Sequence, residues 1–577
     1  MDLSKPILNE EIWSLSREQY PSTTPEAFRL HYDRARSMCR NIGTPNPKFG
    51  GSIAIYDIHD LSPKFWAFHF DLIATRDMTA FIIATIHLNL CIGTLSSFFT
   101  TRPDLSNLLD DLLSFRTCGE FMLTEVGHGL DARNLETAAT LLPNGCFDLH
   151  SPNESAWKAM PPSTPLCGMP RVAIVFARLI VGHDDHGVKP FVVELNDSQQ
   201  MRRGITSRIL PVRPGTKPLD HGITSFDHVL LPPTALLGSE AKPDDARRDF
   251  LQQIWRVSIG TLSLSIMGVS ALRIGSRVAL TYSRRRLITT GDGAAKVPIL
   301  RFSTQRWPIV RGFVKSTVLR AFAEWTIDRF CSKTLSGSVR QALAVVFKTS
   351  VGRETKLLTE LSERCGWQGL FAYNQISELA LTFQGNSIAE GDTLVLCIPP
   401  RSGLGSELLG DKYSLPEPQD PLAPLAKHEL GLIAEARQEM IDLGGYGERR
   451  SAAFNNNIVP RCRKLIEAIG ERMAYEAARA RGVQRELLHL YALLCMEEDL
   501  SWYTGSGVIT RKQFFKSLVE AYKAVLPLLL QFADNTAEAA YITAPIMSDE
   551  SWRIFLQTLQ SFGHSDPSAS LETSSKL

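Results

Sequence analysis

The sequence predicts an α+β protein of several domains, in which a β-barrel or sandwich lies between helical regions. Three observations predict this. The chain has 577 residues, too many for one hydrophobic core. Helical periodicity occupies both ends, and a central block has short β-branched runs separated by turn residues. We expect an N-terminal helical domain at 1–118, a β-barrel domain at 119–240, a helical bundle at 241–402, a second C-terminal helical domain at 403–562 and a disordered tail at 563–577.

The N-terminal region has the spacing of helices and few strand signals. Glu26–Arg40 and Pro63–Thr75 are predicted to be amphipathic helices, and an apolar helix, Phe81–Phe99, follows them. Phe81–Phe99 and a later segment, Ile254–Ile274, approach the roughly 20 apolar residues that cross a bilayer. Both carry interspersed polar residues, which is typical of helices buried in a large bundle. We therefore predict no membrane span.

The central region contains runs rich in valine and isoleucine, bounded by Gly, Pro and Asp. Strands are predicted at Val172–Val181, Pro190–Leu195, Gly204–Leu210 and Ser225–Leu231. Many short strands joined by polar turns indicate a small barrel or sandwich.

Helical spacing returns at Asp244 and continues to about Phe383, which predicts a bundle of long antiparallel helices. The pair Asp244-Asp245 supplies the acidic start that a helix N-terminus favours. Pro399–Pro424 is rich in Pro, Gly and Ser and is predicted to be a linker. A final helical region, Lys427–Phe562, completes the folded chain.

Charge and cysteine content exclude some classes of function. The formal net charge of +1 gives no electrostatic reason to expect nucleic acid or an anionic membrane as a partner. The ten cysteines are scattered, without metal-ligand spacing, and indicate a reducing compartment. His128 and His228 lack the cysteine or carboxylate neighbours that a metal site needs, so we predict no metal.

One motif carries most of the functional information. Leu123–Gly129 reads L-T-E-V-G-H-G, and Leu135–Thr140 reads L-E-T-A-A-T. This pair resembles the flavin-contacting segment of the acyl-CoA oxidases. The resemblance implies FAD as cofactor, held by backbone N–H groups and the Thr124 hydroxyl, with Gly129 letting the main chain approach it. It also implies the acyl-CoA oxidase fold, whose helical, β and helical order and extra C-terminal helical region match the order predicted above.

A second segment carries the candidate base. Ile388–Leu396 reads I-A-E-G-D-T-L-V-L and resembles the oxidase segment that holds the catalytic carboxylate, which falls on Glu390. Gly391 then lets the chain turn tightly beside the flavin. A carboxylate shielded from water is a stronger base, as removal of a thioester α-proton requires.

The element before the base departs from the family pattern. Arg364–Gly369 resembles the oxidase element C-G-G-H-G, which places Gly366 at the cofactor. Here Trp367 and Gln368 replace the family's second Gly and its His. The segment that covers the flavin is represented only by Trp157–Pro162, whose prolines have no N–H to offer. These departures leave FAD in place and make an ordinary fatty acyl-CoA less secure as the substrate.

The resemblance also assigns the FAD pyrophosphate. Arg286, four residues after Tyr282, occupies the position of the family's phosphate-binding Arg, and Gln305 that of a Gln on the next helix. Arginine suits this role because its planar fork meets two phosphate oxygens at once. In the family these contacts come from the partner subunit, so a homodimer is implied.

Two further motifs lie in the β region. Asp220-His221-Gly222 and Phe226–Val229 resemble family elements that organise the barrel and one wall of the substrate site. We expect Asp227 to be structural and to hold a strand end by hydrogen bonds.

The last three residues are Ser575, Lys576 and Leu577, the peroxisomal import tripeptide, at the end of the polar tail. They predict an import receptor as a partner and the peroxisomal matrix as the location.

Together these features predict an FAD-dependent acyl-CoA oxidase-like enzyme. It would oxidise an acyl-CoA to the trans-2-enoyl-CoA and pass electrons to oxygen, giving hydrogen peroxide. Two alternatives stay open. One is a dehydrogenase-like desaturase of a specialised acyl chain in peroxisomal secondary-metabolite or toxin biosynthesis, and the other is a non-catalytic relative that binds acyl-CoA or a partner. Chain length and branching are not set by the sequence.

Overall fold

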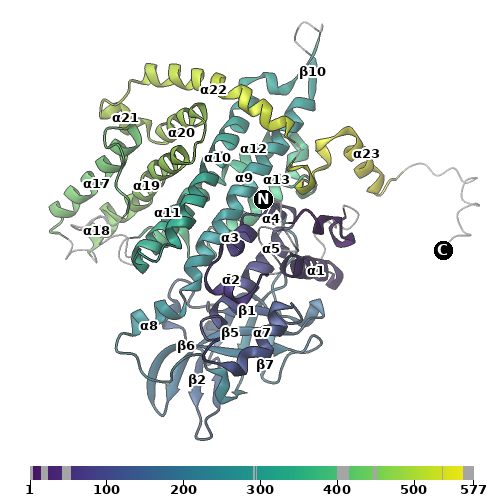
Figure 1. Ribbon diagram of the computed structural model, residues 1–577, viewed down its shortest axis with the longest axis vertical. Coiled ribbons are helices and arrows are strands. Elements are labelled where there is room, and N and C mark those ends of the chain that lie inside the picture. Colours follow the sequence, from purple (N-terminus) through teal and green to yellow (C-terminus); the bar gives the residue numbers. More distant parts are fainter. Residues whose placement is uncertain are drawn as a thin grey trace, which may run out of the picture.

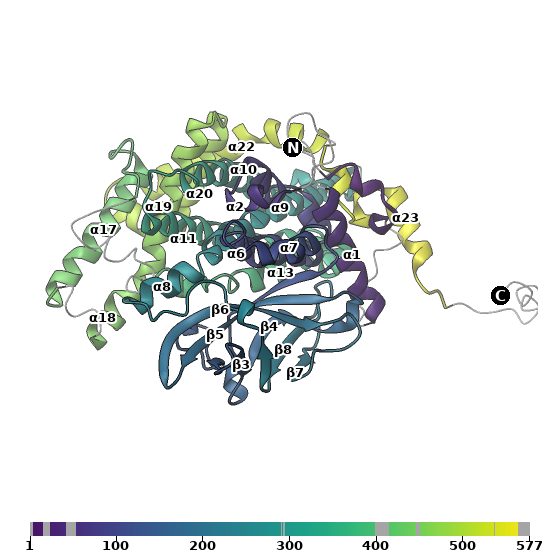
Figure 2. The same ribbon diagram turned by 60° about the horizontal axis from the view of Figure 1, so that its bottom comes forward.

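The computed structural model describes residues 4–14, 24–41, 53–289, 291, 293, 295–398, 415–445, 451–535 and 537–562. Long helices form the centre of the molecule, and the β region covers one end of them. Most of the C-terminal helices lie along one side, whereas the last one, α23 (Asp549–Thr558), lies on the opposite side (Figure 1). Figure 2 shows the strands together beneath the helices. This is the predicted α+β arrangement.

The N-terminal region is helical, as predicted. Its helices are α1 (Pro25–Asn41), α2 (Ile55–His59), α3 (Pro63–His69), α4 (Ile73–Arg76), α5 (Met78–Thr85), the π-helical η4 (Ile86–Ile92), α6 (Gly93–Leu95) and α7 (Ser106–Leu113).

The helix predicted at Pro63–Thr75 is instead two helices, because Asp71 interrupts it. The Asp71 carboxylate accepts a hydrogen bond from the N–H of Ile73 (2.9 Å), which gives the backbone an alternative to the helical bond. Asp71 also accepts a bond from the N–H of Ser4 (3.0 Å), so the buried carboxylate ties the chain start to this break.

The β region consists of two sheets. Six strands form the larger sheet, in which β5 pairs in parallel with β1 and β2 along one edge and antiparallel with β6 along the other. The larger sheet comprises β1 (Cys118–Met122), β2 (Ala138–Leu141), β3 (Phe147–His150), β5 (Arg171–Val181), β6 (Asp184–Asn196) and β9 (Val229–Leu231). The smaller comprises β4 (Lys158–Pro162), β7 (Ile205–Ile209) and β8 (His221–Phe226).

The side chains of β5 alternate between two cores. Val172, Ile174 and Phe176 belong to the large helical core, whereas Val175 and Leu179 pack in a separate core shared by both sheets. This period of two is the pattern of a strand buried on both faces. The shared core between two sheets favours the sandwich over a closed barrel.

The strand predicted at Ser225–Leu231 is wrong as a single strand. The chain leaves the smaller sheet after Phe226 and joins the larger one at Val229. His228 between them has a φ of 49°, in the left-handed region, so the extended backbone cannot continue through it.

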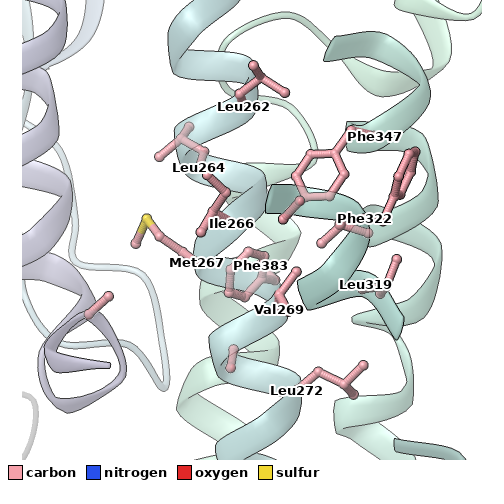
Figure 3. Close-up of a cluster of buried hydrophobic side chains, with 14 of the residues drawn as sticks. Leu262, Leu264, Ile266, Met267, Val269, Leu272, Leu319, Phe322, Phe347 and Phe383 are labelled. Carbon is pink, nitrogen blue, oxygen red and sulfur yellow. The ribbon is translucent and has the colours of Figure 1, made fainter. Parts of the chain in front are cut away.

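The bundle is built on α9 (Arg256–Arg285) and α10 (Ser303–Phe330). Figure 3 shows Leu262, Ile266, Phe322, Phe347 and Phe383 meeting in its interior. The bundle also contains α8 (Ala246–Gln253), β10 (Leu287–Thr289), β11 (Lys296–Pro298), α11 (Gly337–Glu354), α12 (Leu357–Glu363), α13 (Ile376–Asn386) and α14 (Thr393–Leu396).

Asp245 begins the bundle, as predicted, by accepting hydrogen bonds from the N–H groups of Arg247 and Arg248 at the start of α8. Two helices are long and apolar enough to cross a membrane, Met78–Leu95 and Arg256–Arg285, and their apolar windows are 89% and 83% buried inside the protein. They are core helices of the fold, and the first ends at Leu95 rather than Phe99.

The C-terminal region is helical and packs against the bundle, with α19 lying against α10 and α11. Its helices are α17 (Pro424–Asp442), α18 (Ala452–Asn457), α19 (Val459–Ala480), α20 (Arg485–Glu498), α21 (Leu500–Gly505), α22 (Arg511–Asp534) and α23 (Asp549–Thr558). Most of the predicted linker, from 399 to 414, and the tail from 563 lie outside the described residues. The domain boundaries therefore stay predictions.

Candidate active site

Glu390 lies in a short loop between α13 and α14 and faces α9. Its backbone has a φ of 56° and that of Gly391 a φ of 89°, so two consecutive residues are left-handed. The hydroxyl of Thr261 on α9 donates to the carbonyl of Glu390 (2.9 Å). The Glu390 carboxylate packs on Gly260, where a Cβ would lie 2.5 Å from Glu390 Cδ. The loop therefore presents its carboxylate to the first turns of α9.

Burial makes Glu390 a suitable base near neutral pH. Removal of its carboxyl group from water raises its pKa to about 8, and the positive charge of Lys348 opposes this rise. A general base works best when its pKa lies near the working pH. A carboxyl with a raised pKa thus lies at the position that the sequence predicts for the base.

The sequence does not mark Lys348, which contacts this loop from α11. The residue is 3% exposed, and its ammonium donates to the carbonyl oxygens of Ala389 and Gly391. A lone lysine in the middle of a helical segment carries no pattern that marks it as functional, so only the folded chain reveals it.

Glu125 joins the two halves of the predicted flavin segment. Its carboxylate accepts hydrogen bonds from the N–H groups of Glu136 (2.7 Å) and Thr137 (3.0 Å), and from the ammonium of Lys158 (3.0 Å). Burial opposes ionisation, but Lys158 and these N–H donors hold the pKa of Glu125 below its usual value. The Glu125 carboxylate therefore holds the backbone at Glu136 and Thr137 against the loop that carries Glu125.

The predicted cofactor contacts Thr124 and Gly129 lie at the two ends of this loop. The carbonyl of Thr124 accepts a bond from the N–H of Ala159 (3.0 Å), which aligns it with β4. Gly129 is exposed, and a Cβ there would meet nothing within 4 Å. In contrast, a Cβ on Gly127 would lie 2.6 Å from Ser155 Cβ, so Gly127 is required by the protein itself. Gly129 has open space beside it, as a ligand contact needs.

Arg286, Gln305 and Gly366 form a second group around Tyr282. A Cβ on Gly366, whose φ is 60°, would lie 3.7 Å from the Tyr282 hydroxyl. Gln305 donates to the Ser283 hydroxyl (2.9 Å) and to the carbonyl of Arg364 (2.6 Å). The side-chain NH2 group of Gln305 thus already donates two hydrogen bonds. At least one of them must break before this group can donate to a phosphate.

The three consecutive arginines differ in their partners. Arg284 pairs with Asp534 (2.8 Å), and Arg285 bonds to the carbonyl of Ile546 and to Asp549. Arg286 is exposed and its side chain makes no hydrogen bond or ion pair with another described residue. An exposed guanidinium without a partner among the described residues can bind a phosphate-bearing group.

The two groups lie at opposite ends of α9. Gly260 and Thr261 contact the Glu390 loop in its second turn, whereas Arg286 follows its last residue. At 1.5 Å per residue, the 25 residues between Gly260 and Arg285 span roughly 37 Å. The structure therefore does not bring all the predicted site residues together within one chain.

Comparison with known proteins relates the whole chain to one family. No protein-family model matches it. Peroxisomal acyl-coenzyme A oxidase 3 of Homo sapiens is 24% identical over 377 residues, which are 57% of this chain and 53% of that protein. The crystal structure of acyl-CoA oxidase 1 from Yarrowia lipolytica superimposes with a TM-score of 0.77, at 18% identity, over 99% of this chain and 91% of that one.

The chain resembles the acyl-CoA oxidases, distantly in sequence and over nearly its whole length in fold. The predicted fold is confirmed by these neighbours. A second solved neighbour, acyl-CoA oxidase-2 of Caenorhabditis elegans bound with FAD, ascaroside-CoA and ATP, has a TM-score of 0.68 at 16% identity and covers 95% of this chain and 94% of that one. The matched segment spans about half the length of the human relative.

The structure corrects the role expected for Asp227. The Asp227 side chain is 83% exposed, and its backbone N–H, not its carboxylate, bonds to Gly204. The buried carboxylate is that of Asp220, which accepts hydrogen bonds from Tyr32 (2.7 Å) and Arg171 (2.9 Å). Asp220 therefore ties α1 to β5. The motif Asp220-His221-Gly222 does not by itself indicate that Asp220 is buried.

His150, Asp227 and His228 offer ligand atoms within 4.8 Å of one another. The two imidazole rings are stacked at 4.2 Å, so their nitrogen lone pairs run side by side rather than converging on one point. Nδ1 of His228 is also engaged by Asp148 at 2.9 Å. The prediction that no metal is needed stays a prediction.

Proposed function

We propose that this chain is an FAD-dependent acyl-CoA oxidase that converts an acyl-CoA to its trans-2-enoyl-CoA. In this reaction the α C–H bond breaks and its proton passes to the Glu390 carboxylate. The β C–H bond breaks with its electron pair, and a carbon–carbon double bond forms. When bound, FAD would accept that hydride and pass its two electrons to oxygen, which takes up the hydride's proton and the proton released by Glu390 to give hydrogen peroxide.

The observation that carries this proposal is the buried Glu390 carboxyl, with a pKa raised to about 8, at the position of the family's base. Gly260 leaves room for it, and Thr261 holds the backbone of the same residue. A module that only binds acyl-CoA has no need for such a carboxylate, whose burial carries an energetic cost. The arrangement therefore favours an enzyme over the binding-only alternative.

FAD as the cofactor is supported by the fit of the chain's residues. Arg286 offers an unpaired guanidinium, and Gly129 and Gly366 leave space beside the backbone. The Caenorhabditis elegans neighbour is a complex with FAD. Thr124 and Gly391 complete the contacts proposed for the flavin ring, with Gln305 beside Arg286.

A panel of acyl-CoA substrates, read by hydrogen peroxide release, tests this function. We expect the purified protein to be yellow and to release peroxide with at least one member, and Glu390→Gln to stay yellow without doing so. Enoyl product formed only with an artificial electron acceptor would support the dehydrogenase-like alternative instead. A colourless protein that FAD does not reconstitute would contradict the proposal.

A homodimer is part of the proposal because the two groups lie at opposite ends of α9. Each site would take Glu390 from one subunit and Arg286 from the other, related by a twofold axis. Large exposed apolar side chains follow Arg286 and Gly366 in the chain, as a buried interface requires: Leu287, Ile288, Phe302, Trp367, Leu370 and Phe371. Sedimentation at micromolar concentration would give the mass of a dimer if this is correct.

The peroxisome is the proposed location. The human relative is named a peroxisomal oxidase, and the tripeptide Ser575 to Leu577, which lies outside the described residues, stays a prediction of the import signal. Removal of these three residues should leave folding and flavin content intact and move a tagged protein to the cytosol. Retention in peroxisomes, in cells without an intact copy to carry it, would contradict this reading.

A further inference from the structure

The backbone around Glu390 is held in a costly conformation by two helices. A non-glycine residue in the left-handed region is disfavoured, so Glu390 needs contacts that fix it. Three successive carbonyls supply these contacts. Those of Ala389 and Gly391 accept hydrogen bonds from the Lys348 ammonium on α11, and that of Glu390 accepts from Thr261 on α9.

Lys348 differs from the other buried lysines of the described chain. The others each lie within 4.0 Å of a carboxylate: Lys64 with Asp57, Lys158 with Glu125, Lys189 with Asp249 and Lys315 with Glu354. Lys348 instead donates to main-chain carbonyls, although it is 3% exposed. A buried ammonium without an ion pair is expensive, and its pKa falls to about 8 because of burial.

The charges that face this ammonium belong to the base-bearing loop. Glu390 and Asp392 are the acidic groups whose fields act on Lys348, and Lys348 is the charge that acts on Glu390. The residues that α9 places against the loop, Gly260 and Thr261, are uncharged. The same ammonium thus determines both the shape of the loop and the electrostatic environment of its carboxylate.

We propose that Lys348 is a positioning residue for Glu390, one that fixes the main chain on both sides of the base and places a positive charge beside it. This inference rests on the proposed function, in which Glu390 removes the α-proton. Because opposite charges favour ionisation, Lys348 keeps more of Glu390 in its basic form than burial alone would allow.

Lys348→Met tests the proposal, because it removes the ammonium and keeps the length of the side chain. We expect normal FAD content, a fall in kcat of at least tenfold, and an alkaline displacement of the pH at which kcat reaches half its maximum. If Lys348 had only a structural role, its replacement by Met would lower the melting temperature without moving that midpoint.

Three companion variants isolate the cause. Lys348→Arg retains the charge and should keep the wild-type midpoint even where kcat falls, and it also serves if Lys348→Met does not fold. Thr261→Val removes the other hydrogen bond to the loop and no charge, so kcat should fall at an unchanged midpoint. Lys189→Met removes a buried lysine of β6 that pairs with Asp249, and should lower stability alone.

The Glu390→Gln background separates the two ideas. Lys348→Met should cause no additional loss of rate there, because no base remains to be positioned. If Glu390→Gln abolishes turnover while Lys348→Met leaves kcat and the midpoint unchanged, the role of Lys348 is wrong and the proposed function stands. If Glu390→Gln turns over normally, the proposed function is wrong, and the role of Lys348 falls with it.

Discussion

Glu390 and Gly260 are in direct contact, and the carboxylate of Glu390 occupies the space of the side chain that Gly260 lacks. A Cβ at position 260 would lie 2.5 Å from Glu390 Cδ, 2.7 Å from Oε2 and 2.8 Å from Oε1. Real Cβ atoms do not approach other atoms so closely, so one group would have to move. The orientation of the base therefore depends on a glycine in a different helix.

Gly260→Ala should displace the Glu390 carboxylate while the fold survives. Alanine is a better helix former than glycine by about 1 kcal/mol, so α9 itself gains. The added methyl group pushes the carboxylate away, and an error of about 1 Å in a reacting group can cost on the order of 100-fold in rate. We expect normal flavin content and a strongly reduced kcat. Gly352→Ala in α11, where a Cβ meets nothing within 4 Å, is the matched control and should be fully active.

Glu390→Gln should lower kcat by about 10²–10⁴-fold, the range that general bases supply. In the wild-type enzyme the base is the ionised form, so kcat should rise with pH and level off above about 8, following the raised pKa of Glu390. Steady-state rates between pH 5.5 and 9.5 measure this dependence. A plateau that already begins at pH 5 would show that the carboxyl is not enclosed as described.

The same raised pKa has a consequence for stability. Between the ordinary pKa of 4.5 and about 8, the folded protein holds a proton on Glu390 that the unfolded chain has released. Stability of the wild type therefore falls as pH rises through this window, relative to Glu390→Gln. We expect equal urea midpoints near pH 4.5 and a more stable variant above pH 8, by at most about 1.4 kcal/mol per unit of pKa difference. If the wild type and Glu390→Gln have equal urea midpoints both near pH 4.5 and above pH 8, the burial of this carboxyl is contradicted.

The sequence predicted the features that depend on residues close to one another along the chain. The α+β order, most helices and three of the four predicted strands follow from residue periodicity, and Glu390 and the flavin segment follow from their resemblance to the family. Their local sequence largely determines these features.

Contacts between distant segments could not be predicted in this way. Lys348 and Gly260 gain their roles from neighbours on other elements, and nothing in their own sequence surroundings marks them. Asp220 belongs to a motif, but its partners Tyr32 and Arg171 lie on distant elements. Likewise, the strand expected at Ser225–Leu231 has the right composition, but its central residues are needed for the crossing between two sheets.

Mixing two inactive variants tests whether the site is shared between subunits. Arg286→Ala should lose a charge-assisted phosphate contact worth about 1.5–3 kcal/mol and be purified with little FAD, whereas Glu390→Gln should bind FAD without turnover. If Glu390 and Arg286 of one site come from different subunits, each mixed dimer carries one intact site. Random mixing should then restore about a quarter of wild-type activity.

The neighbouring arginines provide the controls for that experiment. Arg284→Ala and Arg285→Ala disrupt pairs with Asp534 and Asp549 and should keep their FAD. No recovery on mixing, from variants shown to exchange subunits, would mean that one chain supplies the complete site.

The Glu125–Lys158 pair should determine whether the flavin segment stays folded. Both side chains are fully buried and lie 3.0 Å apart. Glu125→Ala leaves the ammonium of Lys158 without its partner and frees the N–H groups of Glu136 and Thr137. A loss of about 3–5 kcal/mol in the free energy of unfolding is expected, together with weaker FAD binding.

Removing both charges should be less harmful than removing one, because the cost of the single variant is mainly that of an uncompensated buried charge. Glu125→Gln with Lys158→Met should therefore be more stable than Glu125→Ala, measured by urea unfolding. Glu136→Ala is the control, since the side chain of Glu136 is 41% exposed and its backbone N–H, the donor to Glu125, is retained. If Glu125→Ala unfolds at the wild-type urea concentration and binds FAD equally well, the pair does not hold this loop, and the motif glutamate must serve the cofactor in another way.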